Sequence, residues 1–240
     1  CGGHLLGLVP KLHLPNYGEF YELRHFTPGN QEVEDVWVPE EGEDGDYISF
    51  GTKLLFTCEE LPGLSVAAEI CEGVWVPNPP SIGHALAGAT VIVNCSASDE
   101  TTGKNLYRES LIGGQSARLV CGYIYANAGE GESSQDLVFG GHNIIAENGT
   151  VLAVSERFGH HTIYADLDLL RLNSERRRMT TYGQLTPEQL ETYETVHFSL
   201  QPDEFELIYY IMLSAKLQCL KKTSSLKRVS IAYPAVFCCW

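Results

Sequence analysis

The chain has 240 residues, of which 44% are hydrophobic and 20% are charged, and its formal net charge is −15. This composition excludes a fibrous or intrinsically disordered protein, and the length suffices for one large domain or two small ones. The strong negative charge argues against nucleic acid and anionic membrane surfaces as partners, because both repel an acidic protein.

Cysteine usage and apolar runs limit the class of protein further. The eight cysteines form no CxxC pair and no Cys/His metal spacing, so they predict buried thiols in a reducing, cytoplasmic compartment, without a disulfide framework or a metal site. No apolar stretch approaches the 18 residues of a transmembrane helix, and no signal peptide is recognisable. Because the chain opens on Cys1 and stops at Trp240 without a cap or turn, we expect a fragment truncated at both ends.

The first predicted element is a short strand at Gly7–Val9, with Lys11 just beyond its end. An isolated lysine is normally a solvated surface residue, although one at a strand end can also act as a functional cation. Four aromatic residues follow between Tyr17 and Phe26, and they either line a pocket or cover the core. The acidic run Gln31–Asp46 is interpreted as a solvated loop rather than as a metal site.

The stretch Leu64–Ser81 predicts a buried strand that ends on Cys71 and turns at once. Short apolar runs bounded by breakers are typical of strands that are packed on both faces. A cysteine at the end of such a strand is held rigidly and can face a cleft, as a nucleophile must. Free cysteine is also among the most buried residue types, so on this stretch alone a core cysteine is the preferred interpretation.

The rest of the chain alternates helical and strand patterns, which predicts a layered α/β architecture with a mixed sheet. A strand pair is expected within Tyr47–Thr57. Further strands are expected at Thr90–Cys95, Val120–Ala126, Asp136–Phe139, Asn143–Glu147, Val151–Ser155 and Ile163–Asp168. Helices are expected at Ile82–Gly88, Asn105–Leu119, Leu169–Met179, Pro187–Tyr193 and Pro202–Leu220. The run Arg176–Arg178 is interpreted as a solvated or interface face of its helix.

Several motifs occur in an order that resembles the carbon–nitrogen hydrolase (nitrilase) superfamily. These are LHLPNYGEFYE after Lys11, EICEGVWVPNPPS around Cys71, NCSASDE at Asn94–Glu100, and the segments Tyr125–Gly149 and Ala165–Tyr182. More narrowly, they resemble the glutamine-hydrolysing domain of glutamine-dependent NAD+ synthetases, over Gly7 to about Tyr182. The resemblance implies a nitrilase-like α-β-β-α layered sandwich with mixed sheets, incomplete at its N-terminus. The expected domains are 1–185 for this glutamine amidohydrolase fold and 186–240 for a helical linker leading to a missing or divergent synthetase domain.

The resemblance also implies a Glu–Lys–Cys catalytic triad. The nucleophile falls on Cys71 and the oxyanion-stabilising lysine on Lys11, while a carboxylate moves the thiol proton to the leaving ammonia. That general base lies upstream of the lysine in the family, and no Glu precedes Lys11 here. We therefore expect the base to be lost by truncation and the fragment to be impaired. Glu22 matches a second acidic residue that positions the lysine and substrate, and it is not an equivalent replacement.

Substrate-binding positions carry over onto Tyr17, Phe20, Glu72 and Ser98, which would hold the α-amino and α-carboxylate groups of L-glutamine. The basic residue that the family places soon after Ser98 is Lys104 here, which lacks the bidentate fork of arginine. Gly73 stands where an acidic or amide residue is expected.

In the family, a synthetase domain uses the ammonia, ATP and Mg²⁺ to convert deamido-NAD+ to NAD+. Arg228–Ala232 resembles the start of its nucleotide-binding strand, but Tyr233-Pro234-Ala235 replaces the expected glycines. Proline lacks the N–H that phosphate binding needs, so we expect that domain to be absent and no cofactor in this chain. The family also implies a homo-oligomer. Two alternatives stay open: a stand-alone hydrolase of another small amide, and a catalytically dead assembly module.

Overall fold

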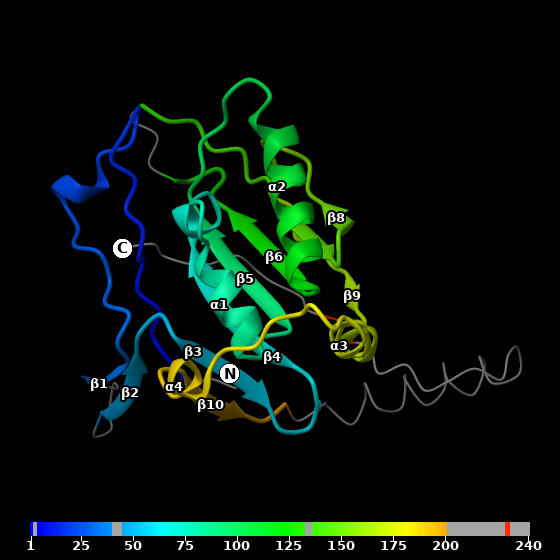
Figure 1. Cartoon of the computed structure of the whole chain (residues 1–240). Helices are drawn as coiled ribbons and strands as arrows, with labels where there is room; N and C mark the ends of the chain where they lie inside the picture. The colour runs from blue at the N-terminus through cyan, green and yellow to red at the C-terminus, as the bar shows by residue number, and fades with distance from the viewer. Residues whose placement is uncertain (2–3, 40–44, 133–135, 201–228, 231–240) are drawn as a thin grey trace, which may run out of the picture.

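The computed structural model describes residues 1, 4–39, 45–132, 136–200 and 229–230. It contains a seven-stranded mixed sheet with helices packed on it, which confirms the predicted layered α/β class (Figure 1). In sheet order, the strands are β10 (Glu194–Phe198), β3 (Leu54–Cys58), β4 (Ser65–Ile70), β5 (Val91–Ser96), β6 (Gly122–Asn127), β7 (Ile144–Glu147) and β8 (Thr150–Val154). Outside it, β1 (Glu34–Val38) pairs with β2 (Asp46–Phe50), and β9 (Asp166–Leu167) pairs with β11 (Val229–Ser230).

The centre of the sheet is parallel, because two helical crossovers join its strands. Helix α1 (Pro80–Ala87) connects β4 to β5, and helix α2 (Lys104–Leu119) connects β5 to β6. Both helices cover the same face of the sheet (Figure 1). The carboxyl ends of β4, β5 and β6 consequently meet at one edge, which is where open α/β sheets bind ligands.

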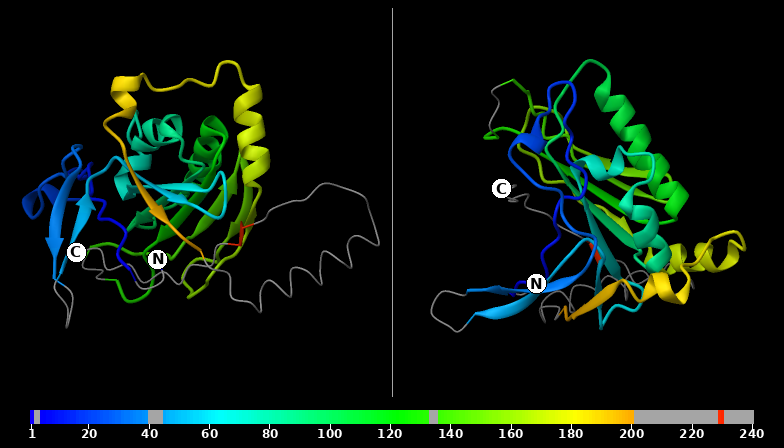
Figure 2. Two further views of the ribbon diagram at one scale, coloured as in Figure 1. Left: turned by 90° about the horizontal axis from the view of Figure 1, so that it is seen from below. Right: turned by 60° about the vertical axis from the view of Figure 1, so that its left-hand side comes forward.

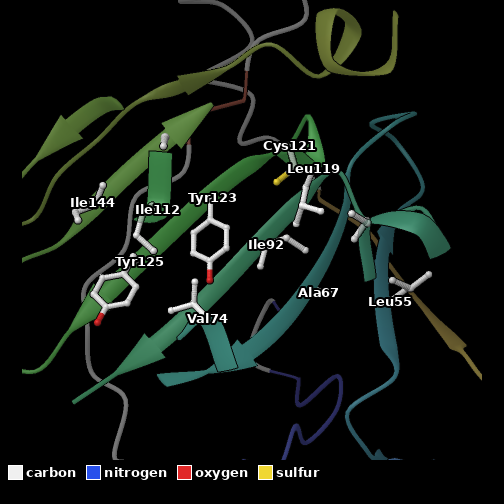
Figure 3. Close-up of a cluster of buried hydrophobic side chains, with 13 residues drawn as sticks. Leu55, Ala67, Val74, Ile92, Ile112, Leu119, Cys121, Tyr123, Tyr125 and Ile144 are labelled. Carbon is white, nitrogen blue, oxygen red and sulfur yellow. The ribbon is translucent and has the colours of Figure 1, made fainter. Parts of the chain in front are cut away.

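The central strands are apolar on both faces because both faces are covered. Val91 and Ile92 are adjacent and fully buried, yet they belong to two different apolar clusters. The first cluster fills the space between the sheet and α1 and α2 (Figure 3). The second lies on the opposite face and includes Leu167 of β9 and Leu172 of helix α3 (Leu169–Arg178). Burial on both sides explains why these strands read as continuous apolar runs in the sequence.

Local capping residues set the helix boundaries. Helix α1 begins at Pro80, whose missing N–H costs nothing at a first helical position, and it is terminated by Gly88, whose φ is +121°. Helix α3 begins after Asp168, whose carboxylate accepts the backbone N–H of Arg171 at 2.9 Å. Asp168 is therefore the N-cap of α3.

Most of the predicted elements are present, including the strand that ends at Cys71, but several details were wrong. The strands within Tyr47–Thr57 do not pair with each other, because β2 pairs with β1 and β3 lies in the main sheet. Asp136–Phe139 forms no strand, and only Phe139 makes an isolated bridge, to Asp99. The Gly7–Val9 strand is reduced to a bridge between Leu8 and Phe50.

Two strands were not predicted, and one predicted helix cannot be compared. Strand β1 lies in the acidic run interpreted as a loop, and β10 pairs in parallel with β3 although it lies beyond residue 185. Helix α4 (Pro187–Leu190) is shorter than predicted. The predicted helix Pro202–Leu220 lies outside the described residues, and of Arg228–Ala232 only β11 is described.

Arg176 joins α3 to the ends of the two crossover helices. Its Nε donates to the carbonyl of Val120 at 3.0 Å, and a terminal nitrogen donates to the carbonyls of Ala89 at 2.7 Å and Leu119 at 3.0 Å. The Tyr182 hydroxyl adds a second donor to the Leu119 carbonyl at 2.9 Å. The segment from α3 to α4 then crosses the helical side of the sheet (Figure 2). Of the run expected to form a solvated or interface face, Arg177 and Arg178 are exposed, whereas Arg176 binds carbonyls of other segments inside the fold.

Replacing Arg176 with alanine should lower the free energy of unfolding by about 2–3 kcal/mol, because three buried carbonyls lose a charged donor. Urea unfolding followed by circular dichroism measures this change. The neighbouring exposed Arg177 provides the matched control, and its alanine variant should change stability by less than about 0.5 kcal/mol. Equal effects of the two substitutions would show that Arg176 does not clamp the fold.

His84 couples α1 to the segment that leads into β10. Its side chain is buried, and its Nδ1 lies 3.1 Å from the hydroxyl of Tyr193. Burial lowers the pKa of His84 to about 4. The folded protein therefore keeps this imidazole neutral well below the pH at which the unfolded chain protonates it.

This lowered pKa predicts a loss of stability in acid. Between about pH 6.5 and pH 4 the unfolded chain binds a proton that the folded chain does not, so the free energy of unfolding falls by up to about 3 kcal/mol. His84→Gln should reduce the dependence of the free energy of unfolding on pH in this range, whatever the stability of the variant at pH 7. His197→Gln, at an exposed position on β10, should leave the slope unchanged. Urea unfolding at a series of pH values tests both variants.

Candidate active site

Cys71 lies at the point where β4 ends and the short 3-10 helix η2 (Cys71–Val74) begins. Its φ is +48°, a left-handed conformation that is uncommon for a residue with a side chain. Such strained residues cluster at functional sites. A Cβ at Gly73, two residues on, would lie 3.3 Å from the Cβ of Glu69, so this tight turn has little room for the larger residue expected there.

A cavity of about 490 Å³ opens beside Cys71 at the carboxyl edge of the sheet. Its size falls within the range of small-molecule sites. Six of the eight residues predicted for the site line it: Tyr17, Phe20, Cys71, Glu72, Ser98 and Lys104. The remaining walls come from Pro15, Glu19, Trp75, Thr101, Thr102, Gly103 and Tyr107. Segments far apart in the sequence therefore converge on one thiol.

Tyr17 and Glu72 bridge two walls of this cavity. The Tyr17 hydroxyl donates to the Glu72 carboxylate at 2.7 Å. Burial, and then the hydrogen bond to Glu72, raise the pKa of Tyr17 to about 12. Tyr17 therefore stays protonated at neutral pH and presents Glu72 as a fixed carboxylate beside the thiol.

Lys104, at the first turn of α2, is already paired in the structure. Its ammonium forms an ion pair with Asp99 and lies 5.8 Å from the ring centre of Phe20 and 5.7 Å from that of Trp75. Contacts of a cation with aromatic faces and a carboxylate restrict its position. Lys104 thus places a positive charge with restricted mobility on the cavity wall. Its ion pair with Asp99 was not indicated by the sequence.

Lys11 and Glu22 contact each other but do not line the cavity. The Lys11 ammonium lies 2.6 Å from both oxygens of the Glu22 carboxylate, and both side chains are partly exposed. Pro15, four residues after Lys11, does line the cavity. The structure therefore joins Lys11 to Glu22, and neither residue is among those that line the cavity beside Cys71.

Ser98 sits on a loop that buried polar residues hold rigidly. Its backbone N–H donates to the Asn127 side chain at 2.8 Å, and its hydroxyl accepts from Arg108 at 3.3 Å. Arg108 is completely buried and also pairs with Glu100 at 2.7 Å and His142 at 2.9 Å. Sequence reasoning missed Arg108, although a charged residue one turn before Ile112 on the buried stripe of α2 was a usable signal.

Two kinds of feature are absent from the part of the chain that the structure describes. No group of three or more His, Cys, Asp or Glu side chains there is placed to hold a metal ion. No helix in those same residues is long and apolar enough to cross a bilayer.

Comparison with known proteins gives one family and a consistent set of relatives. The family model described as carbon–nitrogen hydrolase matches residues 2–177. The glutamine-dependent NAD(+) synthetase of Mycobacterium tuberculosis is 44% identical over 205 residues, which are 83% of this chain and 30% of that protein. The enzyme of the same name from Homo sapiens is 30% identical over 185 residues, covering 74% of this chain and 26% of its own length.

Two solved structures, one of a glutamine-dependent NAD(+) synthetase and one of a carbon–nitrogen hydrolase, are also similar to this chain. A glutamine-dependent NAD(+) synthetase from Cytophaga hutchinsonii superposes with a TM-score of 0.52 at 28% identity, over 65% of this chain and 24% of its own. A carbon–nitrogen hydrolase from Helicobacter pylori G27 also gives 0.52, at 19% identity over 70% of this chain and 54% of its own, which is a likeness of fold. The chain thus spans less than a third of the length of the curated synthetases it matches.

Proposed function

Since the chain belongs to the carbon–nitrogen hydrolase family, we propose that it is the part of a glutamine-dependent NAD+ synthetase that releases ammonia from L-glutamine. The observation that carries this proposal is the strained Cys71 on the wall of a cavity that also holds fixed charges of both signs. A free amino acid carries an ammonium and a carboxylate on one carbon. Glu72, presented by Tyr17, suits the ammonium, while Lys104 and Ser98 suit the carboxylate.

The proposed reaction has two halves. The Cys71 sulfur attacks the side-chain amide carbon, the carbon–nitrogen bond breaks, and the thiol proton leaves on ammonia. Water then attacks the thioester, the carbon–sulfur bond breaks, and glutamate and the thiol are released. We assign Lys11 to stabilisation of the oxyanion that develops in each half. Its contact with Glu22 would orient the ammonium.

The general base of this reaction needs a carboxylate with a free oxygen near the thiol. The carboxylate of Glu22 contacts Lys11, that of Glu69 accepts from Tyr123 and from the Ser81 N–H, and that of Glu72 accepts from Tyr17. Both oxygens of Glu22 and both oxygens of Glu69 are engaged, whereas one oxygen of Glu72 accepts from Tyr17. We therefore propose that Glu22 and Glu69 are not the base, that Glu72 holds the substrate ammonium instead, and that hydrolysis by this chain alone is impaired. In the whole enzyme the ammonia would serve the ATP- and Mg²⁺-dependent amidation of deamido-NAD+ in a synthetase part, within a homo-oligomer.

Covalent labelling tests substrate choice without needing complete turnover. The chloroketone analogue of L-glutamine should alkylate Cys71 selectively, as located by peptide mass spectrometry, and L-glutamine should protect it. L-asparagine and propionamide should protect poorly, because one is too short and the other lacks the charged head group.

Three other outcomes would overturn the proposal. Equal protection by propionamide would favour a hydrolase of another small amide. Labelling of Cys71 no faster than that of the buried Cys58 would favour a catalytically dead assembly module. Selective labelling combined with no ammonia release, even in the full-length parent protein, would refute glutamine hydrolysis.

A further inference from the structure

The strained backbone of Cys71 is held by a single buried side chain. The Cys71 N–H donates to Oδ1 of Asn94 at 3.1 Å, and the Cys71 carbonyl accepts from Nδ2 of Asn94 at 3.4 Å. A left-handed conformation at a residue with a Cβ costs about 1–3 kcal/mol and persists only where its surroundings impose it. Asn94 satisfies both backbone polar groups of the strained residue at once.

Two further hydrogen bonds, with the hydroxyls of Ser96 and Tyr123, fix the orientation of the Asn94 amide. The Ser96 hydroxyl donates to Oδ1 at 2.9 Å, and Nδ2 donates to the Tyr123 hydroxyl at 3.3 Å. An asparagine amide has two acceptor positions and two donors, and here all four are used. Asn94 is 1% exposed, so water offers no alternative partner, and a rotated amide would leave buried groups unpaired.

The chain of contacts continues to the start of α1. The Tyr123 hydroxyl donates to one oxygen of Glu69, and the other oxygen accepts the Ser81 N–H at 2.9 Å. Tyr123 projects from β6 into the core with its hydroxyl directed towards Val74, three residues after the nucleophile (Figure 3). Glu69 and Asn94 are also opposite each other in the pairing of β4 with β5. The backbone of Cys71 is thereby tied to two strands and a helix.

We propose that Asn94 is a positioning residue, which together with Tyr123 and Glu69 holds Cys71 in its left-handed conformation so that the thiol faces the cavity. The three side chains act through the backbone of Cys71, and both oxygens of Glu69 are engaged within the network. This inference rests on the proposed role of Cys71 as nucleophile. It adds the reason why this position can be occupied by a residue other than glycine.

Variants of the full chain should separate positioning from folding. In Asn94→Asp the shape is kept but both donors are lost, and the Cys71 carbonyl then faces an acceptor. Alkylation of Cys71 by iodoacetamide and by the glutamine chloroketone should slow by about 100-fold, the effect of a misplaced reacting group. Binding of L-glutamine, measured by calorimetry, should change by no more than about threefold. Tyr123→Phe removes only the hydroxyl behind the amide and should slow alkylation by about 10-fold.

Arg176→Ala serves as the matched control, because it destabilises the fold at a distance from this network. It should leave the alkylation rate of Cys71 unchanged at temperatures where the protein is folded. Wild-type alkylation rates in folded Asn94→Asp would overturn the inference while leaving the glutaminase proposal intact. If Asn94→Asp does not fold, Tyr123→Phe decides, and a loss of less than about twofold would overturn the inference. Absence of selective Cys71 labelling in the wild-type chain would instead count against the proposed function.

Discussion

In the full-length parent protein, replacing Cys71 with alanine is expected to lower the rate of ammonia release from L-glutamine by at least about 10⁴-fold, because no thioester can form. The substitution removes only the sulfur atom, which borders an existing cavity, so it should change the free energy of unfolding by less than about 1 kcal/mol. Initial rates of ammonia release at saturating glutamine measure the effect. Adduct formation with the glutamine chloroketone is followed in parallel, because it requires the thiol but not the hydrolytic half-reaction.

Cys121 provides the control for this substitution. It is a fully buried cysteine immediately before β6, and burial raises the pKa of its thiol to about 12. It therefore carries almost no thiolate at neutral pH. Cys121→Ala should retain glutamine hydrolysis and lose only stability. Hydrolysis above about 1% of the wild-type rate in Cys71→Ala would exclude Cys71 as the nucleophile.

The position of Cys71 at a strand end was predictable, whereas its surroundings were not. An apolar run closed by Gly73 and a proline-rich turn is a local pattern, and it indicated β4 with little ambiguity. The cavity depends on which strands lie side by side, and no local pattern specifies that. The convergence of Tyr17, Ser98 and Lys104 on Cys71 was expected only from resemblance to a known family.

The buried polar residues near the site are recognisable in the sequence as interruptions of apolar runs. Glu69 and Asn94 each interrupt an apolar run, and Arg108 interrupts the buried stripe of α2. A buried polar side chain must find partners, so such interruptions predict a network. Which partners they find depends on strand register and helix docking, and these are fixed by contacts distant in sequence.

The two strands that were not predicted, β1 and β10, are edge strands, and they escaped prediction for a different physical reason. In β10 only Val196 and Phe198 are half-buried, and in β1 the residues that face outwards are mostly acidic. An edge strand has one partner and one solvated side, and charge there discourages unwanted pairing. Its composition therefore resembles that of a loop. The strand predicted at Asp136–Phe139 was the opposite error, a strand that is absent. Its apolar residues suggested a strand, but they pair with no strand among the described residues.

In the full-length parent protein, replacing Lys11 with methionine is expected to lower kcat for glutamine hydrolysis by about 10²–10³-fold, because its ammonium is assigned to a charge that exists only in the transition state. KM for glutamine should stay within about threefold of the wild-type value. Lys104→Met should show the opposite pattern. Its ammonium lies on the cavity wall beside Phe20 and Trp75, where it is assigned to the substrate carboxylate, so KM should rise by about 10-fold or more with little change in kcat.

The contrast between the two lysines is the decisive part of this prediction. A general loss of stability would move both parameters in both variants, whereas distinct roles move one parameter in each. Lys53→Met, at a lysine that contacts Thr192 away from the cavity, controls for the loss of a positive charge in this acidic chain. If Lys11→Met matches Lys53→Met, Lys11 does not stabilise the oxyanion. If Lys11→Met instead raises KM alone, the pair it forms with Glu22 belongs to substrate binding, and the oxyanion must be stabilised by other donors around Cys71.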